Sequence, residues 1–174
     1  RNPDIEAVDG MGREARAFEC DFVVGLGGGS SMDAAKAAAV LAANEMNAED
    51  LYKMAWQNKS LPVLAVPTTC GTGSEVTAVS VLTYGGTKKS FKSADIIPQI
   101  AFLDARYLNS LPQAITVDTA VDALSHAAEG YLVADNWISG MYAERVFEFF
   151  GNCRQSLLSG DYSHADRERM LFMA

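Results

Sequence analysis

The chain has 174 residues, 49% of them hydrophobic and 21% charged, which is typical of an ordinary globular protein and excludes disordered, collagen-like and disulfide-stabilised classes. Its 22 acidic side chains outnumber the 14 basic ones, and a formal net charge of −8 would repel nucleic acid and anionic lipid, so we expect neither a nucleic acid nor a membrane as a partner. Three cysteines without CxxC spacing, and a polar start with no signal peptide, predict reduced thiols in a cytoplasmic protein.

The first part of the chain predicts alternating helices and strands. Apolar residues at three- and four-residue spacing indicate a helix over 3–18, with Asn2 as its N-cap and Pro3 at its first position. The apolar run FVVGL (22–26) predicts a buried parallel strand, and an alanine-rich helix over about 31–43 follows a glycine run. Strand, glycine turn and helix together make half of a βαβ unit.

Further along, two more buried strands are predicted at 62–66 and 99–103. Between them, a strand over 79–84 and the residues around Phe91 predict a hairpin that turns at Gly85–Gly86.

Beyond Arg106 the pattern contains no strand run. Helices are predicted over 116–133, 138–158 and 165–174. The change of pattern predicts an α/β domain over 1–105, followed by the start of an all-α domain over 106–174. A start without methionine and an apolar last helix indicate an internal fragment of a longer protein.

The first candidate site is the glycine run between strand and helix, with Gly28, Gly29 and Ser30. Glycines let the backbone approach a phosphate closely, and the helix start offers unpaired N–H groups and a positive dipole end. A structural tight turn explains such a run about as often. The spacing GGGSxxDxxK favours a phosphate site, although Asp33 can also be read as a charge that simply complements the helix dipole.

The second candidate site is the loop PTTCGTGSE over 67–75, which directly follows a strand. Clustered hydroxyls and glycines suit a ribose, a pyrophosphate or a nicotinamide amide, and a polar loop with local side-chain turns is the alternative. Two such loops at the carboxyl ends of neighbouring parallel strands would face the same crevice, where open α/β sheets bind ligands.

The third candidate is a pair of metal ligands, Asp122 and His126, four residues apart on one helix face. Oxygen and imidazole nitrogen suit Fe²⁺ or Zn²⁺. A structural ion pair explains the spacing at least as well. The other histidine, His164, is expected in an exposed loop and helix cap.

The segments GLGGGSSMDAAKA, VPTTCGTGSEVT, FLDARYLNSLP and DALSHAAEGY, in this order, resemble the iron-containing (group III) alcohol dehydrogenase family. The resemblance implies a Rossmann-like nucleotide-binding domain, truncated at its N-terminus, followed by the start of an all-α metal-binding domain. It further implies hydride transfer between a small-molecule alcohol or aldehyde and NAD or NADP, an Fe²⁺ cofactor with Zn²⁺ as the alternative, and a homodimer or larger homo-oligomer.

The same resemblance implies a role for each matching residue. Gly28, Gly29 and Ser30 would bind the pyrophosphate, and Asp122 and His126 would be the first two metal ligands. The phosphates, ribose and nicotinamide would be lined by Thr68, Thr69, Gly71, Thr72 and Thr77, with Val79 and Val81 packing nearby. Lys88 would contact the ribose, although Lys89 also fits. No catalytic residue is visible beyond the metal ligands. Cys70 stands where members of the family often have a small residue such as alanine, which is a mild departure from the family pattern.

Three alternatives remain open. One is a glycerol dehydrogenase-like polyol dehydrogenase. Another is a metal-free maleylacetate reductase, against which the presence of both Asp122 and His126 argues. The third is a catalytically incomplete nucleotide-binding fragment, and we expect the 174 residues alone to be inactive because two ligands do not complete a catalytic metal site.

Overall fold

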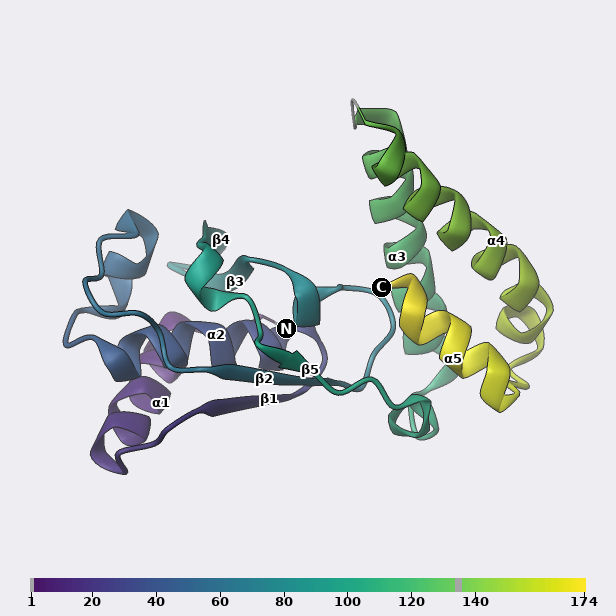
Figure 1. The fold of residues 1–174 in the computed structure, drawn as a ribbon. Coiled ribbons are helices and arrows are strands. Elements are labelled where there is room, and N and C mark those ends of the chain that lie inside the picture. Colours follow the sequence, from purple (N-terminus) through teal and green to yellow (C-terminus); the bar gives the residue numbers. More distant parts are fainter. Residues whose placement is uncertain (1, 134–135) are drawn as a thin grey trace. The chain divides into compact units, whose positions relative to one another are not determined.

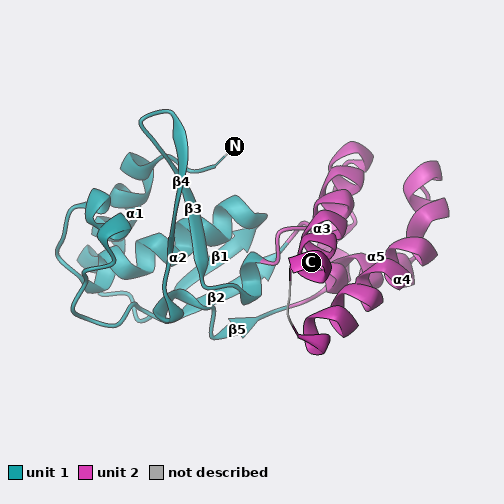
Figure 2. Cartoon of the chain, turned by 90° about the horizontal axis from the view of Figure 1, so that it is seen from above, with its two compact units in different colours: residues 1–67, 74–102 teal, residues 68–73, 103–174 magenta. Residues whose placement is uncertain are grey.

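The computed structural model describes residues 2–133 and 136–174, which form two compact units (Figure 2). The first unit comprises Arg1–Pro67 and Ser74–Phe102, and the second comprises Thr68–Gly73 and Leu103–Ala174. The domains predicted over 1–105 and 106–174 stay a prediction, because compactness does not test which part folds by itself.

The first unit alternates helices and strands (Figure 1). Its helices are α1 (Ile5–Ala17) and α2 (Gly29–Ala43), with the 3₁₀ helices η1 (Ala48–Lys53), η2 (Ser74–Val76) and η3 (Ala94–Ile96). Its strands are β1 (Val23–Gly27), β2 (Val63–Pro67), β3 (Val79–Tyr84), β4 (Thr87–Lys92) and β5 (Ile100–Ala101). Strands β1, β2 and β5 form a parallel sheet in the order β1-β2-β5, which confirms the predicted α/β class.

The predicted hairpin is also confirmed. Strand β3 pairs antiparallel with β4, and Gly85 and Gly86 join them with φ values of 58° and 75°. Positive φ at both turn positions fits the tight two-residue turn that glycines favour. The strand expected over 99–103 is shorter, although the Gln99 and Phe102 amides still donate to the Val63 and Ala65 carbonyls of β2 at 2.8 Å.

Strand β1 was predicted correctly, but its complete burial was wrong. Val24 and Leu26 are 48% and 61% exposed, whereas Gly25 is buried. Side chains of a strand alternate between its faces, and α2 covers the face on which Gly25 lies. A Cβ on Gly25 would stand 2.9 Å from the Met32 Cα, so glycine here lets α2 pack directly on the strand.

Helix α2 is the central element of the first unit. It contacts α1, β1, β2 and β3, and every residue of 32–42 is buried. A helix that is buried on all sides is expected to be apolar on all sides, and this one is mostly alanine. Asp33 and Lys36 are the two charged exceptions.

Helix α1 begins later than predicted. Asp4 is its N-cap, so the assignment of Asn2 as the cap and of Pro3 as the first helical residue was wrong. Both residues instead bond to the hairpin: the Asn2 side-chain amide donates to the Val81 carbonyl at 3.1 Å, and the Pro3 carbonyl accepts from the Thr83 amide at 2.8 Å. A local cap signal was overridden by hydrogen bonds to a distant strand.

The second unit is helical, as predicted. It contains η4 (Ala105–Leu108), α3 (Gln113–Val133), α4 (Trp137–Ser159) and α5 (His164–Met173). Helix α4 contacts both α3 and α5, and a capping box in which Ser163 and Asp166 exchange hydrogen bonds starts α5. The buried core side chains are Cys70, Leu108, Ala120, Ala123, Cys153, Leu157, Met170, Leu171 and Met173. Within the described residues, no helix combines the length and the apolar character needed to cross a bilayer.

The two glycines of α1 allow a matched test of packing. A Cβ on Gly12 would stand 2.5 Å from the Leu41 Cβ of α2, whereas a Cβ on Gly10 would meet nothing within 4 Å. We expect Gly10→Ala to stabilise the protein by about 0.5–1 kcal/mol through helix propensity. Gly12→Ala should instead destabilise it by about 1–3 kcal/mol through overpacking. Urea unfolding measures both variants, and equal effects would contradict the close contact between α1 and α2.

Candidate functional site

The glycine run lies at the point where β1 ends and α2 begins. Gly27 is the last residue of the strand, Gly28 is the helix N-cap, and Gly29 and Ser30 are the first helical residues, so α2 starts two positions before the predicted Ser31. Gly28 has no side chain to cap the first N–H groups, and the first turn carries no acidic residue. The positive end of α2 is therefore suited to an anion such as a phosphate.

Gly27 makes this turn possible. Its φ of 140° is strained for a residue with a side chain, and a Cβ would overlap the side chain of Ser31. In the register of the parallel sheet Gly27 stands opposite Pro67, so β1 and β2 end side by side. The two predicted loops therefore begin at adjacent carboxyl ends.

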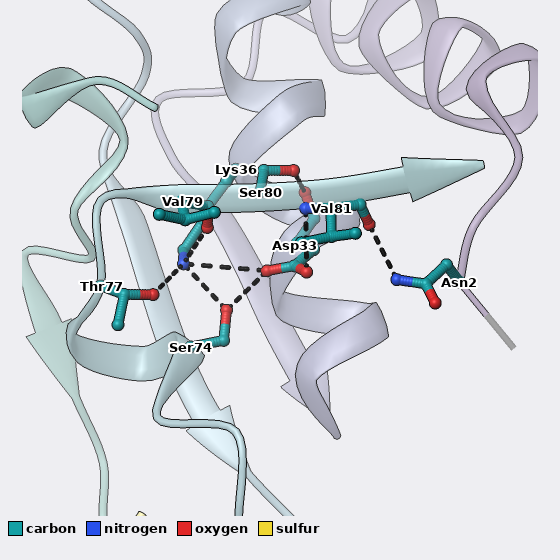
Figure 3. Close-up of polar contacts among 8 residues, drawn as sticks. All are labelled: Asn2, Asp33, Lys36, Ser74, Thr77, Val79, Ser80 and Val81. Carbon is teal, nitrogen blue, oxygen red and sulfur yellow. Dashed lines mark hydrogen bonds and ion pairs between the residues drawn. The ribbon is translucent and has the colours of Figure 1, made fainter. Parts of the chain in front are cut away.

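A buried ammonium group links α2 to the segment that leads into the hairpin (Figure 3). Lys36 is completely buried, and its Nζ donates to the Ser74 Oγ at 2.8 Å, the Thr77 Oγ1 at 3.3 Å and the Val79 carbonyl at 2.8 Å. A lysine ammonium has three N–H donors. All three therefore have an acceptor, in η2, in the following loop and at the start of β3.

Asp33, one helical turn before Lys36, bonds to the same segment. Its carboxylate accepts from the Ser74 Oγ at 2.7 Å and from the Val81 amide at 3.1 Å, and its backbone carbonyl accepts from the Ser80 Oγ at 2.8 Å. The Lys36 Nζ lies 3.9 Å from the Asp33 Oδ1. Ser74 thus accepts from the lysine and donates to the aspartate, which closes the network.

Burial and charge act on these groups in opposite directions. Burial lowers the pKa of Lys36 to about 8, while the negative charges of Asp33 and Glu75 limit that fall. Burial also raises the pKa of Asp33, and hydrogen bonds from Ser74 and Val81 together with the charge of Lys36 oppose the rise. The pKa of Glu75 is raised by burial as well. Three ionisable groups therefore share a region that excludes water.

The interpretation of Asp33 as a charge that only complements the helix dipole was wrong, because the residue is buried and paired. Ser74 and Ser80 were not recognised as members of the network. The available signal was a single Asp–Lys pair at i,i+3 spacing on a helix that otherwise reads as alanine, where an exposed face would carry several charges. Such a pair inside an apolar helix predicts buried partners elsewhere in the chain.

The sequence alone did not decide whether Lys88 or Lys89 would contact the ribose. In the hairpin these two lysines lie on opposite faces. Lys88 stands opposite Thr83, on the same face as Val79 and Val81. Lys89 lies on the other face, with its Nζ 4.4 Å from the ring centre of Tyr84. Lys89 is therefore engaged in a cation–π contact, whereas Lys88 shares a face with two of the predicted cofactor residues.

In the second unit, the loop after β2 packs against α3. Cys70 is completely buried with its Sγ 3.3 Å from the Thr119 Oγ1, and a Cβ on Gly71 would overlap the Thr119 carbonyl oxygen. Burial raises the pKa of the Cys70 thiol, which keeps it protonated. The glycine at position 71 therefore has a packing reason. Thr68, Thr69 and Thr72 are half-buried, and their predicted cofactor contacts stay predictions.

The predicted metal ligands lie together on α3. The His126 Nε2 is 3.9 Å from the Asp122 Oδ1, with side chains 54% and 45% exposed. A groove of about 280 Å³, shared by α3, α4 and the end of α5, is lined in part by His126, Tyr142 and Met173. One oxygen and one nitrogen on a single face fit a divalent cation as two of its ligands. Among the described residues, no group of three or more His, Cys, Asp or Glu side chains gathers into a complete metal site.

His164 was expected in a loop or cap. It is instead the first residue of α5, while Ser163 is the cap. Its exposed Nε2 lies 3.5 Å from the Glu168 Oε1, so this histidine forms a surface pair within its own helix. The predicted exposure of His164 is confirmed, since its side chain is 63% exposed.

Comparison with known proteins gives these features a family context. The sequence profile of the family described as iron-containing alcohol dehydrogenase matches residues 1–105. The chain is 36% identical over 175 residues to the sulfoacetaldehyde reductase of Bilophila wadsworthia, covering 98% of this chain and 45% of that protein. It is 35% identical over 167 residues to the lactaldehyde reductase of Escherichia coli, covering 92% of this chain and 44% of that protein.

The chain also matches solved structures of related proteins. The sulfoacetaldehyde reductase of Bifidobacterium kashiwanohense, solved in complex with NAD⁺, matches with a TM-score of 0.84 and 34% identity, over 99% of this chain and 48% of that one. The chain thus spans a little under half the length of the relatives that it matches.

The buried lysine generates a pH prediction. Because the pKa of Lys36 is about 8 in the folded protein against 10.5 for a free lysine, the folded state binds fewer protons than the unfolded state between these values. The free energy of unfolding should therefore rise with pH over this range through Lys36, by at most about 1.4 kcal/mol per pH unit. In urea unfolding from pH 7 to 10, the free energy of unfolding of the parent minus that of Lys36→Met should rise with pH. Ser80→Ala removes a non-titrating hydroxyl of the same network, and its difference should stay constant. A constant difference for Lys36→Met would contradict the lowered pKa.

Proposed function

The chain belongs to the iron-containing alcohol dehydrogenase family, and on this premise we propose that the whole protein transfers hydride reversibly between a small primary alcohol or its aldehyde and a nicotinamide dinucleotide. The observation that carries the proposal is the uncapped glycine start of α2 at the carboxyl end of a parallel strand, within the 1–105 segment that matches the family. Parallel α/β sheets bind dinucleotides at such positions.

In the proposed complex, the backbone N–H groups at Gly28, Gly29 and Ser30 bind the pyrophosphate, since they begin a helix whose positive end has no side-chain cap. NAD is the proposed cofactor, supported by the NAD⁺ complex of the related sulfoacetaldehyde reductase, and NADP is the alternative. The residues proposed to line the rest of the cofactor are Thr68, Thr69, Gly71, Thr72, Thr77, Val79, Val81 and Lys88.

Lys88 is proposed in preference to Lys89 as the ribose contact. Its support is the shared face with Val79 and Val81, and the occupation of Lys89 by Tyr84 on the opposite face. A lysine already placed over an aromatic ring would have to give up that contact to reach a ribose hydroxyl.

Asp122 and His126 are proposed to hold the metal, with Fe²⁺ favoured by the family and Zn²⁺ as the alternative. When bound, such an ion supplies Lewis acidity that polarises a carbonyl or stabilises an alkoxide. Both side chains are half-exposed and already lie on one face of α3, so binding requires no change of the helix. A catalytic site needs about three protein ligands, so at least one further ligand is required beyond this pair.

The substrate is proposed to be a small aldehyde or its alcohol, because the related proteins named above are reductases of sulfoacetaldehyde and lactaldehyde. For the 174-residue chain alone we propose nucleotide binding without turnover, which the presence of only two candidate ligands on α3 supports. A polyol substrate, and the homodimer or larger oligomer that the resemblance implies, stay predictions.

The proposed activity and the metal pair can be tested together. The whole protein, loaded with Fe²⁺ or Zn²⁺, should reduce a short aldehyde with NADH, followed by loss of absorbance of the reduced nicotinamide. His126→Ala should lose bound metal and lower the rate at least about 100-fold, since even the loss of a residue that only supports a metal ligand costs 10–100-fold. His164→Ala, at the other exposed histidine, should leave metal content and rate unchanged.

Elemental analysis read beside the rate separates the possible outcomes. A His126→Ala variant with parental metal content and rate would show that the Asp122–His126 pair is a surface ion pair. A metal-loaded parent protein without turnover on aldehydes, alcohols or polyols would overturn the proposed function itself.

The phosphate site has its own test. A valine side chain at Gly29 would occupy space at the start of α2 that the proposed pyrophosphate needs. Gly29→Val should therefore weaken NADH binding by at least tenfold, or about 1.4 kcal/mol. Gly10→Val places the same side chain on an open face of α1 and should bind NADH as the parent does. Titration by NADH fluorescence on folded variants measures both. Parental affinity in Gly29→Val would mean that the glycine run is only a structural turn.

A further inference from the structure

Asp33 and Lys36 are not predicted to touch the cofactor. Both form hydrogen bonds with residues that are predicted to touch it. Lys36 donates to the Thr77 hydroxyl and the Val79 carbonyl, at 3.3 and 2.8 Å. The Asp33 carboxylate accepts from the Val81 amide at 3.1 Å. The buried pair therefore bonds directly to segment 77–81, at the Thr77 side chain and at the backbone of Val79 and Val81 (Figure 3).

Helix α2 carries both the proposed pyrophosphate site and the buried Asp33–Lys36 pair. Its first turn is the proposed pyrophosphate site, and Asp33 and Lys36 follow one and two turns later. Because α2 is packed on β1, β2, β3 and α1, it cannot shift easily. A segment bonded to Asp33 and Lys36 is therefore held at a defined distance from the helix start.

Stability alone does not explain a charged pair at this place. Replacing a buried ion pair by apolar residues of similar volume is often neutral or stabilising, and the neighbours of Lys36 along α2 are alanines. An apolar side chain would, however, remove the donor that bonds to the Thr77 hydroxyl and the Val79 carbonyl. The lysine specifies where these groups lie, which an apolar contact would not do.

We propose that Asp33 and Lys36 are positioning residues for the cofactor: they hold segment 77–81 in register with the N-terminus of α2, so that the nicotinamide half of the dinucleotide binds where the pyrophosphate site places it. The inference rests on the proposed function, and adds to it two residues that act through Thr77, Val79 and Val81.

The test compares NADH with ADP, which carries the phosphates but lacks the nicotinamide and its ribose. Calorimetric titration of the whole protein should show that Lys36→Met raises the dissociation constant of NADH at least tenfold and that of ADP less than twofold. The double variant Asp33→Asn/Lys36→Met removes both charges while keeping the shape of both side chains, so it should fold and show the same selective loss.

Ser60→Ala is the matched control. Ser60 is buried in the same unit and its hydroxyl donates to the Asp95 backbone carbonyl at 2.6 Å, but it lies outside both α2 and segment 77–81. We expect this variant to lose some stability and to keep parental affinity for both ligands.

The outcomes are distinct. Selective loss of NADH affinity in both lysine variants, with Ser60→Ala unchanged, supports the proposal. Unchanged NADH affinity, an equal loss for NADH and ADP, or a selective loss that Ser60→Ala reproduces would each overturn it and leave the proposed function standing. A parent protein that binds neither ligand would overturn the proposed function, and the inference with it.

Discussion

The first unit depends on the burial of one ammonium group. Lys36 has no exposure to water, and an unpaired charge in such a place would cost several kcal/mol. The cost is offset because three oxygens accept hydrogen bonds from the ammonium group and the Asp33 carboxylate lies 3.9 Å away. These oxygens come from η2, from the loop after it and from β3, so the position of the whole segment follows from the need to satisfy one side chain.

Small residues allow that side chain to be buried. The alanines of α2 let α1 and the sheet approach closely. Gly12 leaves room for the Leu41 side chain, and Gly25 leaves room for the backbone of α2 at Met32. Close approach on all sides excludes water from Asp33 and Lys36, which is also why burial dominates the pKa values of both groups. The same packing fixes the direction in which α2 presents its first N–H groups at Gly29 and Ser30.

The two candidate sites are built by different means. The proposed anion site is made of backbone, and its geometry follows from the turn at Gly27 and the helix start at Gly29, so it needs no side-chain adjustment. The proposed metal pair is made of the half-exposed side chains of Asp122 and His126, which do not complete a metal site by themselves. The family profile matches residues 1–105, which include the proposed anion site, and the chain spans less than half of the related proteins.

The sequence by itself determined the features that arise from neighbours in the chain. Strand, glycine turn and helix, the hairpin at Gly85–Gly86 and the placement of Asp122 and His126 on one helix face all follow from local periodicity and backbone preference. Tertiary structure alone decided the rest. Lys36 meets Ser74, Thr77 and Val79 across about forty residues of sequence, the face of Lys88 depends on strand register, and Gly71 is required by the α3 backbone. No local pattern encodes these, because the hydrogen-bond partner or the steric neighbour of each residue is supplied by a part of the chain that only folding brings close.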